Sequence, residues 1–377
     1  MGLFGSTSNK ETITEAQIRQ ELSKIQDPDL HRDIVSLGFV KDITIKGSDV
    51  GVEIQLTTPA CPVKDQMKAT AEQLIRNLGA TNVDVRMTAQ VTAGSNGPRN
   101  QLMPGVKNTI AVASGKGGVG KSTVAVNLAV ALAMEGSRVG LIDADIYGPS
   151  APLMFGLSDQ RPMMFENAEG QRRLVPLLAH GVKVMSIGFL VDPDQAVIWR
   201  GPMASGALRQ FMSDVEWEEL DYLIFDMPPG TGDIQLTLAQ TIPLTGAVIV
   251  TTPQDIALAD ARKGLKMFER LQVPVLGIIE NMSYFIAPDT GARYDIFSHG
   301  GGAQAATEMG VPFLGEIPLV MEMRIGGDEG VPMVIRNPEA EQSRNVRAIA
   351  RNVAAQVSIA NMAGANKPVQ IILGNDQ

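Results

Sequence analysis

Cysteine is almost absent from this chain, which has one, Cys61, among 377 residues. A single cysteine cannot form a disulfide within the chain, so the pattern excludes a disulfide-stabilised secreted domain and favours the reducing cytoplasm. Also missing are an apolar run of about 18 residues, the length that spans a membrane, and a hydrophobic N-terminal stretch of the secretory type. We therefore expect a cytoplasmic protein that does not enter membranes.

An excess of positive charge is missing too. The chain has 32 Lys and Arg against 41 Asp and Glu, a net charge of −9, and its pI is near 5.0. This acidic balance argues against general affinity for nucleic acid or anionic membranes. What the chain does have is length and a hydrophobic fraction of 44%, enough for two or three domains with substantial cores.

The residue pattern divides the chain into five parts: a flexible N-terminus (1–12), a small domain (13–92), a linker (93–107), a large domain (108–361) and a C-terminal tail (362–377). The small domain reads as α-β-β-α-β, beginning at a capping box made by Thr14 and Gln17. The linker is rich in Gly, Pro and Asn and has no periodicity.

From Thr109 onward, short apolar strands alternate with helical stretches, including those expected at 122–135, 257–271 and 343–360. Continuous apolar strands between helices indicate a mostly parallel sheet covered on both faces. The fold class is therefore α/β, a doubly wound domain preceded by the small one. The expected strands are TIAVAS, RVGLIDAD, KVMSIG, DYLIFDMP, GAVIVTTP, VLGIIEN and PFLGEIP.

A phosphate-binding loop follows the first of these strands. The pattern G-x-x-x-x-G-K-[ST] lies between a strand and a helix, where glycine backbone N–H groups and the helix N-terminus can cradle the phosphates of ATP. Lys121 would neutralise the β- and γ-phosphates, and the Ser122 hydroxyl would bind Mg²⁺. The expected nucleotide contacts are Gly115, Lys116, Gly117, Gly118, Val119, Gly120, Lys121, Ser122 and Thr123.

Three aspartates stand at the ends of other strands, where ligands bind in such sheets. Asp226, which ends an apolar strand, is expected beside the metal together with Ser122. Asp143 and Asp145 follow another strand, and Asp145 is the better placed of the two to orient an attacking water. The alternative for these two aspartates is that they cap the turn that follows.

The segment KGGVGKST resembles the deviant Walker A loop of the dimerising ATPases related to MinD, ParA and the nitrogenase iron protein. In that class the early lysine, which corresponds to Lys116 here, reaches across a subunit interface to the partner's nucleotide. The resemblance therefore implies a homodimer in which Lys116, Lys121 and Asp145 are the catalytic residues, with Lys116 supplying charge at the transferring phosphoryl group.

Within that class the chain is similar to the Mrp/ApbC iron–sulfur cluster carriers over roughly residues 13–361. The motifs VIWRGPM, DMPPGTGD and IENMSYF carry this similarity in the large domain, and DPDLHRDIVSLGFV and LTTPACPVKDQM resemble an iron–sulfur-assembly domain. The family implies Mg²⁺-dependent ATP hydrolysis, and apoprotein clients or assembly proteins as partners. It also implies that Asn281 reads the adenine edge; the alternative is a structural asparagine in a strand-end turn.

The chain departs from that family at the cluster ligands. Relatives typically carry C-x-x-C after ENMSYF, where this chain has Ala287 and Thr290, which cannot ligate iron. Cys61 is then the candidate thiol site, since a helix start and nearby lysines (Lys64, Lys68) favour thiolate, although a lone cysteine also serves as a small buried hydrophobe. His299 is either a ligand or a surface or capping group.

Three functions remain open. The first is an iron–sulfur cluster carrier ATPase with an altered cluster site. The second is a nucleotide-switched scaffold or delivery ATPase that binds no cluster. The third, a positioning ATPase like MinD or ParA, lacks support because such relatives bind membrane or DNA through amphipathic or basic surfaces, and this chain is acidic with a polar tail.

Overall fold

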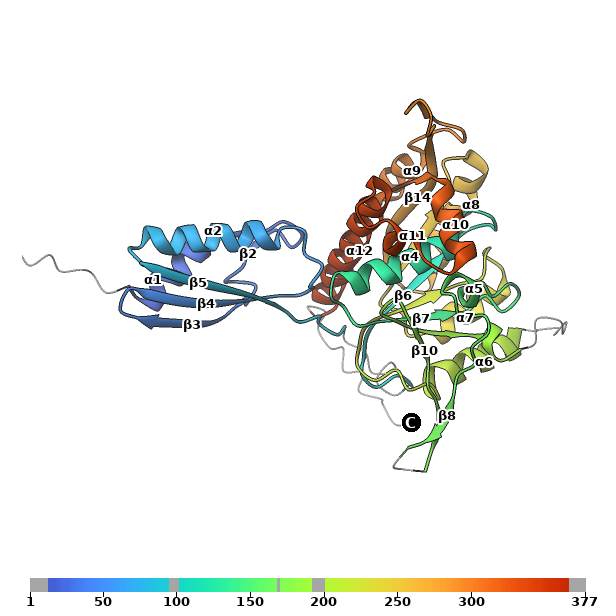
Figure 1. The fold of residues 1–377 in the computed structure, drawn as a ribbon, viewed down its shortest axis with the longest axis horizontal. Coiled ribbons are helices and arrows are strands. Elements are labelled where there is room, and N and C mark those ends of the chain that lie inside the picture. Colours follow the sequence, from blue (N-terminus) through green and yellow to red (C-terminus); the bar gives the residue numbers. More distant parts are fainter. Residues whose placement is uncertain (1–12, 95–101, 168–169, 192–200, 366–377) are drawn as a thin grey trace, which may run out of the picture. The chain divides into compact units, whose positions relative to one another are not determined.

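The computed structural model describes residues 13–94, 102–167, 170–191 and 201–365 (Figure 1). The expected flexible N-terminus, residues 95–101 of the expected linker, most of the tail and the start of the VIWRGPM motif lie outside these residues. The chain divides into two compact units at Val91 and Thr92. The first strand of the large unit begins at Val106, inside the range expected for the linker.

The predicted order α-β-β-α-β appears in the small unit as α1, β3, β4, α2 and β5, and a two-residue antiparallel pair, β1 and β2, which was not predicted, lies between α1 and β3. Its sheet runs β3-β4-β5, with β3 and β4 antiparallel and β4 and β5 parallel. The capping box forms as expected: the Thr14 hydroxyl accepts from the Gln17 N–H, and the Gln17 side chain accepts from the Thr14 N–H. The elements are α1 (Glu15–Leu22), β1 (Gln26–Asp27), β2 (Arg32–Asp33), β3 (Val40–Lys46), β4 (Asp49–Leu56), α2 (Lys64–Asn77) and β5 (Asn82–Ala89).

The large unit is built on a nine-stranded sheet in the order β10-β11-β7-β12-β6-β13-β14-β15, with β16 also paired to β14. All neighbouring pairs are parallel except β10–β11 and β14–β15. The strands are β6 (Val106–Ala113), β7 (Val139–Asp143), β10 (Leu177–Ala179), β11 (Val182–Ser186), β12 (Leu220–Asp226), β13 (Gly246–Thr251), β14 (Val275–Ile286), β15 (Arg293–Tyr294) and β16 (Phe313–Leu319). A separate hairpin of β8 (Met164–Glu166) and β9 (Arg172–Leu174) was not expected from the sequence.

Helices cover this sheet, and β7, β12 and β13 are buried along their whole lengths. That burial confirms the predicted doubly wound fold, because strands buried on both faces need helices on each side. The helices are α4 (Lys121–Met134), α5 (Ala151–Met154), the 3₁₀ turn η1 (Ile187–Phe189), α6 (Gly201–Ser213), α7 (Asp233–Thr241), α8 (Asp255–Arg270), α9 (Gly301–Met309), α10 (Met321–Glu329), α11 (Met333–Arg336) and α12 (Glu341–Ala365).

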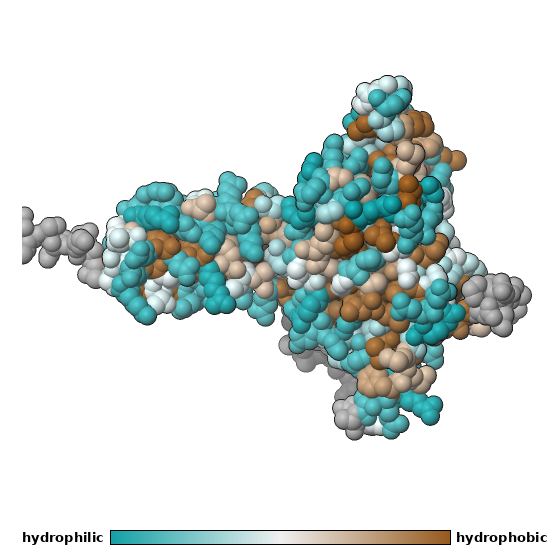
Figure 2. Space-filling view, viewed as in Figure 1, coloured by the Kyte–Doolittle hydropathy of each residue, from teal (hydrophilic) through white to brown (hydrophobic). Residues whose placement is uncertain are grey.

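The surface mixes apolar and hydrophilic side chains, as Figure 2 shows for one face. None of the helices in the described ranges combines the length and apolar character needed to cross a membrane. Chain order along the sheet reverses about β6: β12, β7 and β11 lie on one side, and β13 and β14 on the other. A ligand crevice is expected at the carboxyl ends of the strands beside such a switch point.

Candidate nucleotide site

The phosphate-binding loop lies between β6 and α4, as predicted. Two of its glycines are required by close neighbours. A Cβ on Gly115 would lie 2.2 Å from the backbone carbonyl carbon of Asp260, and one on Gly120, whose φ is +79°, would lie 2.2 Å from Asn281 Nδ2. The loop is therefore held tightly against α8 and β14, and its shape depends on the absence of side chains at these positions.

Lys121, Ser122 and Asp226 come together at the start of α4. The ammonium of Lys121 lies 2.5 Å from Asp226 Oδ1 and 3.1 Å from Ser122 Oγ. The side chains of Lys121 and Asp226 are only 6% and 2% exposed. The structure thus brings the predicted phosphate-binding lysine and the two predicted Mg²⁺ ligands to one point, where the lysine already neutralises the buried carboxylate.

Asp143 is fully buried beside this group. Its carboxylate accepts from the N–H groups of Asp145 and Ala151 at 3.2 and 3.0 Å and from Ser186 Oγ at 3.1 Å. Burial and the nearby Asp226 carboxylate raise the pKa of Asp143 to about 7. These contacts hold the start of α5 and the Asp145 backbone, which fits the capping alternative for Asp143.

Asp145 lies at the edge of the same group and is half-buried. Its carboxylate accepts from the backbone N–H groups of Tyr147 and Gly148. Burial raises its pKa, the Lys121 ammonium opposes that rise, and Asp226 adds to it. Asp145 therefore lies within electrostatic reach of the lysine while staying more accessible than Asp143, as a group that orients water must be.

Lys116 lies in the first turn of the loop and is half-buried. Its backbone carbonyl accepts from Ser114 Oγ at 2.9 Å, and the carbonyl of Ser114 accepts from Gly230 N–H at 3.0 Å. The loop after Asp226 is thereby tied to the phosphate loop. No carboxylate of the described ranges forms an ion pair with Lys116, whose ammonium is thus not committed to this part of its own chain.

Asn281, at 3% exposure, uses one amide hydrogen to reach Val119 O at 2.8 Å. Beside it lies a pocket of about 300 Å³ whose lining includes Thr123 and Ser150. Ser150 Oγ is buried and has no hydrogen-bond partner. Most of this lining was not predicted from the sequence. The segment that ends and follows the strand PFLGEIP could have pointed to it, because ligands bind at the carboxyl ends of such strands. The rest of the lining is Gly120, Leu153, Met154, Met282, Pro318, Leu319, Val320, Met323, Arg324, Gly327 and Asp328.

Cys61 does not have the environment expected from the sequence. Burial is the largest influence and raises the pKa of its thiol, and the carboxylates of Asp27 and Asp29 raise it further, outweighing Lys64. The expectation that a helix start and Lys68 favour thiolate is therefore wrong. The lysine argument failed because the thiol is largely buried in the fold and because Asp27 and Asp29, more than 30 residues earlier in the chain, act on it as well.

Ala287 and Thr290 lie in the turn that joins β14 to β15. The turn is closed by hydrogen bonds from Ala287 N–H to Ala292 O at 2.9 Å and from Gly291 N–H to Ala287 O at 2.8 Å. The Thr290 hydroxyl accepts from Ala292 N–H at 3.3 Å. Both positions therefore belong to a short hairpin turn closed by backbone hydrogen bonds, and neither side chain is a thiol.

Comparisons with known proteins agree with this picture. The family described as NUBPL iron-transfer P-loop NTPase, of the ParA group, matches residues 105–354, and the family described as iron–sulfur cluster assembly protein matches residues 15–86. The chain is 51% identical over 350 residues to the iron–sulfur cluster carrier protein of Synechocystis, covering 92% of this chain and 99% of that protein. To the Escherichia coli protein of the same name it is 45% identical over 343 residues, covering 91% and 92%.

Among solved structures, the chain is similar to the nucleotide-binding protein of Archaeoglobus fulgidus, which was determined in complex with ADP and in which cobalt was found. The TM-score is 0.55 at 40% identity, covering 62% of this chain and 91% of that one. The resemblance to iron–sulfur cluster carriers predicted from the motifs is confirmed for both units of the chain.

Proposed function

This chain belongs to the NUBPL iron-transfer P-loop NTPase family, and from that premise we propose that it is an ATP-hydrolysing iron–sulfur cluster carrier that acts as a nucleotide-gated homodimer. The single observation that carries the proposal is the grouping of Lys121, Ser122 and Asp226 at the end of the phosphate loop. Its partners would be apoprotein clients or iron–sulfur assembly proteins in the cytoplasm.

The residues present fit an adenine nucleotide with Mg²⁺. Gly120 lets the loop approach Asn281 so closely that a Cβ there would collide with its amide, and the lining of the adjoining pocket includes Ser150, whose buried Oγ lacks a partner. The loop N–H groups and Lys121 would hold the phosphates, and Ser122 and Asp226 would hold Mg²⁺, which would supply charge stabilisation at the γ-phosphoryl group. The apolar pocket would take the base, with the remaining amide hydrogen and Oδ1 of Asn281 available to its edge.

Nucleotide binding would give Lys121 new partners. Its ammonium lies 2.5 Å from Asp226 Oδ1 and would turn toward the phosphates if Asp226 held Mg²⁺. The buried Asp226 carboxylate would then keep a cation beside it. Asp145 would then orient the attacking water.

Lys116 would act across the dimer interface. Its side chain is not paired with a carboxylate in the described part of its own chain, and an ammonium delivered to the partner's γ-phosphoryl group would act as an arginine finger does. Hydrolysis would then depend on dimerisation, which is how the nucleotide could gate the release of a cargo.

The alternative function is a nucleotide-switched scaffold or delivery ATPase that binds no cluster itself. Ala287 and Thr290 favour it, because a dimer would lack four thiolates at the place where relatives carry them. Any cluster held through Cys61 would need thiols from glutathione or a client, and would bind weakly.

Iron and sulfide analysis after anaerobic purification and reconstitution separates the two functions. The carrier is supported by a labile iron–sulfur species that disappears in Cys61→Ser, and the scaffold by none in either protein. The double substitution Ala287→Cys, Thr290→Cys serves as a positive control and should gain a cluster. Stoichiometric iron and sulfide in Cys61→Ser would contradict both accounts of the ligands, and failure to bind MgATP would contradict the nucleotide gate.

A further inference from the structure

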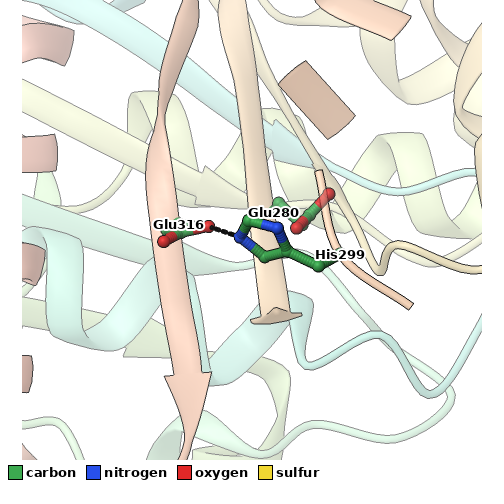
Figure 3. A group of neighbouring side chains, drawn as sticks. All are labelled: Glu280, His299 and Glu316. Carbon is green, nitrogen blue, oxygen red and sulfur yellow. Dashed lines mark hydrogen bonds and ion pairs between the residues drawn. The ribbon is translucent and has the colours of Figure 1, made fainter. Parts of the chain in front are cut away.

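Glu280, His299 and Glu316 form a group of ligand-type side chains outside the nucleotide site (Figure 3). Glu280 in β14 and Glu316 in β16 are direct partners on neighbouring parallel strands. His299 comes from the loop before α9, and Figure 3 shows its imidazole lying between the two carboxylates. One ligand atom from each of the three lies within 4.8 Å of the others.

The charge of this group is unbalanced. Two carboxylates placed opposite each other on adjacent strands repel, and the cost grows with burial, yet Glu280 is 0% exposed. In the described part of the chain, His299 is the one side chain with a cationic form that pairs with either carboxylate, through Nε2 at 2.8 Å from Glu316 Oε2. A single imidazole carries at most one positive charge against two negative charges.

The contacts of Ser283 also indicate that this group lacks positive charge. Its Oγ lies 2.5 Å from Glu280 Oε1 and 2.9 Å from Glu316 Oε2. A hydroxyl has one hydrogen to donate, and both of these neighbours are acceptors when ionised. With both carboxylates ionised, one of these contacts joins two oxygens with no hydrogen between them, and a cation bound to the carboxylates would offset that repulsion.

The carboxylate of Glu280 is held in a fixed orientation. Its Oε2 accepts from Gly302 N–H at 2.5 Å, and its Oε1 accepts from Gly300 N–H at 3.1 Å. Oε2 thus uses one lone pair and keeps another. Backbone N–H groups that orient a ligating oxygen in this way are typical of the outer shell of metal sites. On the open side, the side chains of His299 and Glu316 are 38% and 31% exposed, which gives an ion a route from solvent.

We propose that Glu280, His299 and Glu316 bind one divalent first-row transition-metal ion, such as Zn²⁺ or Fe²⁺. Bonds of about 2.0–2.2 Å would set the ligand atoms about 3–4 Å apart, so the observed spacing closes with small side-chain rotations. An imidazole nitrogen with two carboxylate oxygens suits these ions better than Mg²⁺ or Ca²⁺, which prefer oxygen alone. The ion would join β14, β16 and the start of α9 through one centre.

The test uses the untagged full-length protein, stripped with a chelator, and measures Zn²⁺ binding by competition with a chromophoric chelator. We expect one ion per chain, and at least about tenfold weaker binding in His299→Ala and in Glu316→Gln, by the scale of losses seen at metal sites. Both residues are partly exposed, so these variants should fold. Glu280→Gln is not used, because that side chain also satisfies the backbone of Gly300 and Gly302.

Matched controls separate this site from other ligands. His31→Ala removes an exposed histidine of the small unit, Cys61→Ser removes the thiol, and Glu308→Gln removes an exposed carboxylate; all three should keep wild-type affinity. Co²⁺ should give visible absorption bands that His299→Ala loses. Absence of stoichiometric Zn²⁺, equal affinity in the two site variants and the wild type, or displacement of Zn²⁺ by equimolar Mg²⁺ would each overturn the proposal. None of these measurements involves nucleotide or a cluster, so their failure leaves the carrier proposal intact.

Discussion

Replacing Lys121 by methionine should destabilise the large unit as well as abolish nucleotide binding. Lys121 and Asp226 form an ion pair at 2.5 Å with side chains 6% and 2% exposed, and the buried Asp143 lies beside them. Methionine keeps the length of the side chain but removes the charge, so Asp226 stays buried without a cation. Removing one partner of such a pair costs about 3–5 kcal/mol.

Urea unfolding followed by tryptophan fluorescence measures this cost. Trp217 is 2% exposed and donates to Phe211 O at 2.9 Å, so it reports on the large unit, and a Trp199→Phe background leaves it as the single emitter. With a denaturant slope of about 2–3 kcal/mol per M, the midpoint should fall by about 1–2 M. MgATP binding should be lost in the same protein.

The matched control is Lys121→Met combined with Asp226→Asn, which removes both charges. It should recover a large part of the lost stability without recovering MgATP binding, because the buried carboxylate is gone while the phosphate-binding cation is still missing. A midpoint for Lys121→Met within experimental error of its parent, or a double variant no more stable than the single one, would refute the assignment of this pair as the charge balance of the site.

Four further predictions follow from the same site and from Cys61. Asp145→Ala should keep ATP affinity but hydrolyse about 10²–10⁴-fold more slowly in steady-state assays, and unchanged turnover would remove it from catalysis. Lys116→Ala should bind ATP without hydrolysing it and regain activity when mixed with Asp145→Ala, since the mixed dimer has one site with both groups intact; normal turnover by a monomeric Lys116→Ala would contradict the cross-subunit role. The free energy of unfolding should fall from about pH 4 to about pH 7, by up to about 1.4 kcal/mol per pH unit, because a pKa of about 7 for Asp143 means that the folded state binds the extra proton in this range; a pH series on Asp143→Asn should lack this component. Iodoacetamide should alkylate Cys61 more slowly than a free cysteine at neutral pH, and equal rates would show that its pKa is not raised.

The order of helices and strands could be predicted because short stretches of sequence determine where each one begins and ends. The helix α4 begins at Lys121 directly after the phosphate loop, and the capping box of Thr14 and Gln17 starts α1 where expected. Buried parallel strands need continuous apolar runs, and these stand out from the polar segments between them. The β8–β9 hairpin was not predicted because its strands are three residues long, β8 is exposed and β9 only partly buried, and neither has such a run.

The members of the nucleotide site could be predicted, but their contacts could not. Lys121 and Asp226 meet because the phosphate loop that leads to Lys121 follows the carboxyl end of β6, and Asp226 ends the adjacent strand β12. The hydrogen bond from Asn281 to Val119 O requires β14, which lies on the opposite side of β6 from β12 in the strand order, to reach the phosphate loop. Cys61 shows the opposite failure: neighbours close in sequence suggested a thiolate, whereas burial in the fold raises the pKa of the thiol, and Asp27 and Asp29, distant in sequence, raise it further.

The group of Glu280, His299 and Glu316 could not be predicted from the sequence, because it depends on the pairing register of two strands. Glu280 and Glu316 become neighbours only because β14 and β16 pair in parallel with those residues opposite, and a shift of one residue would send one carboxylate to the other face. His299 alone reads as a surface or capping residue, and its partner Glu316 lies beyond α9 in the chain. A ligand set assembled from two strands and a loop has no spacing motif, so the pairing of the strands has to be known before its chemistry can be inferred.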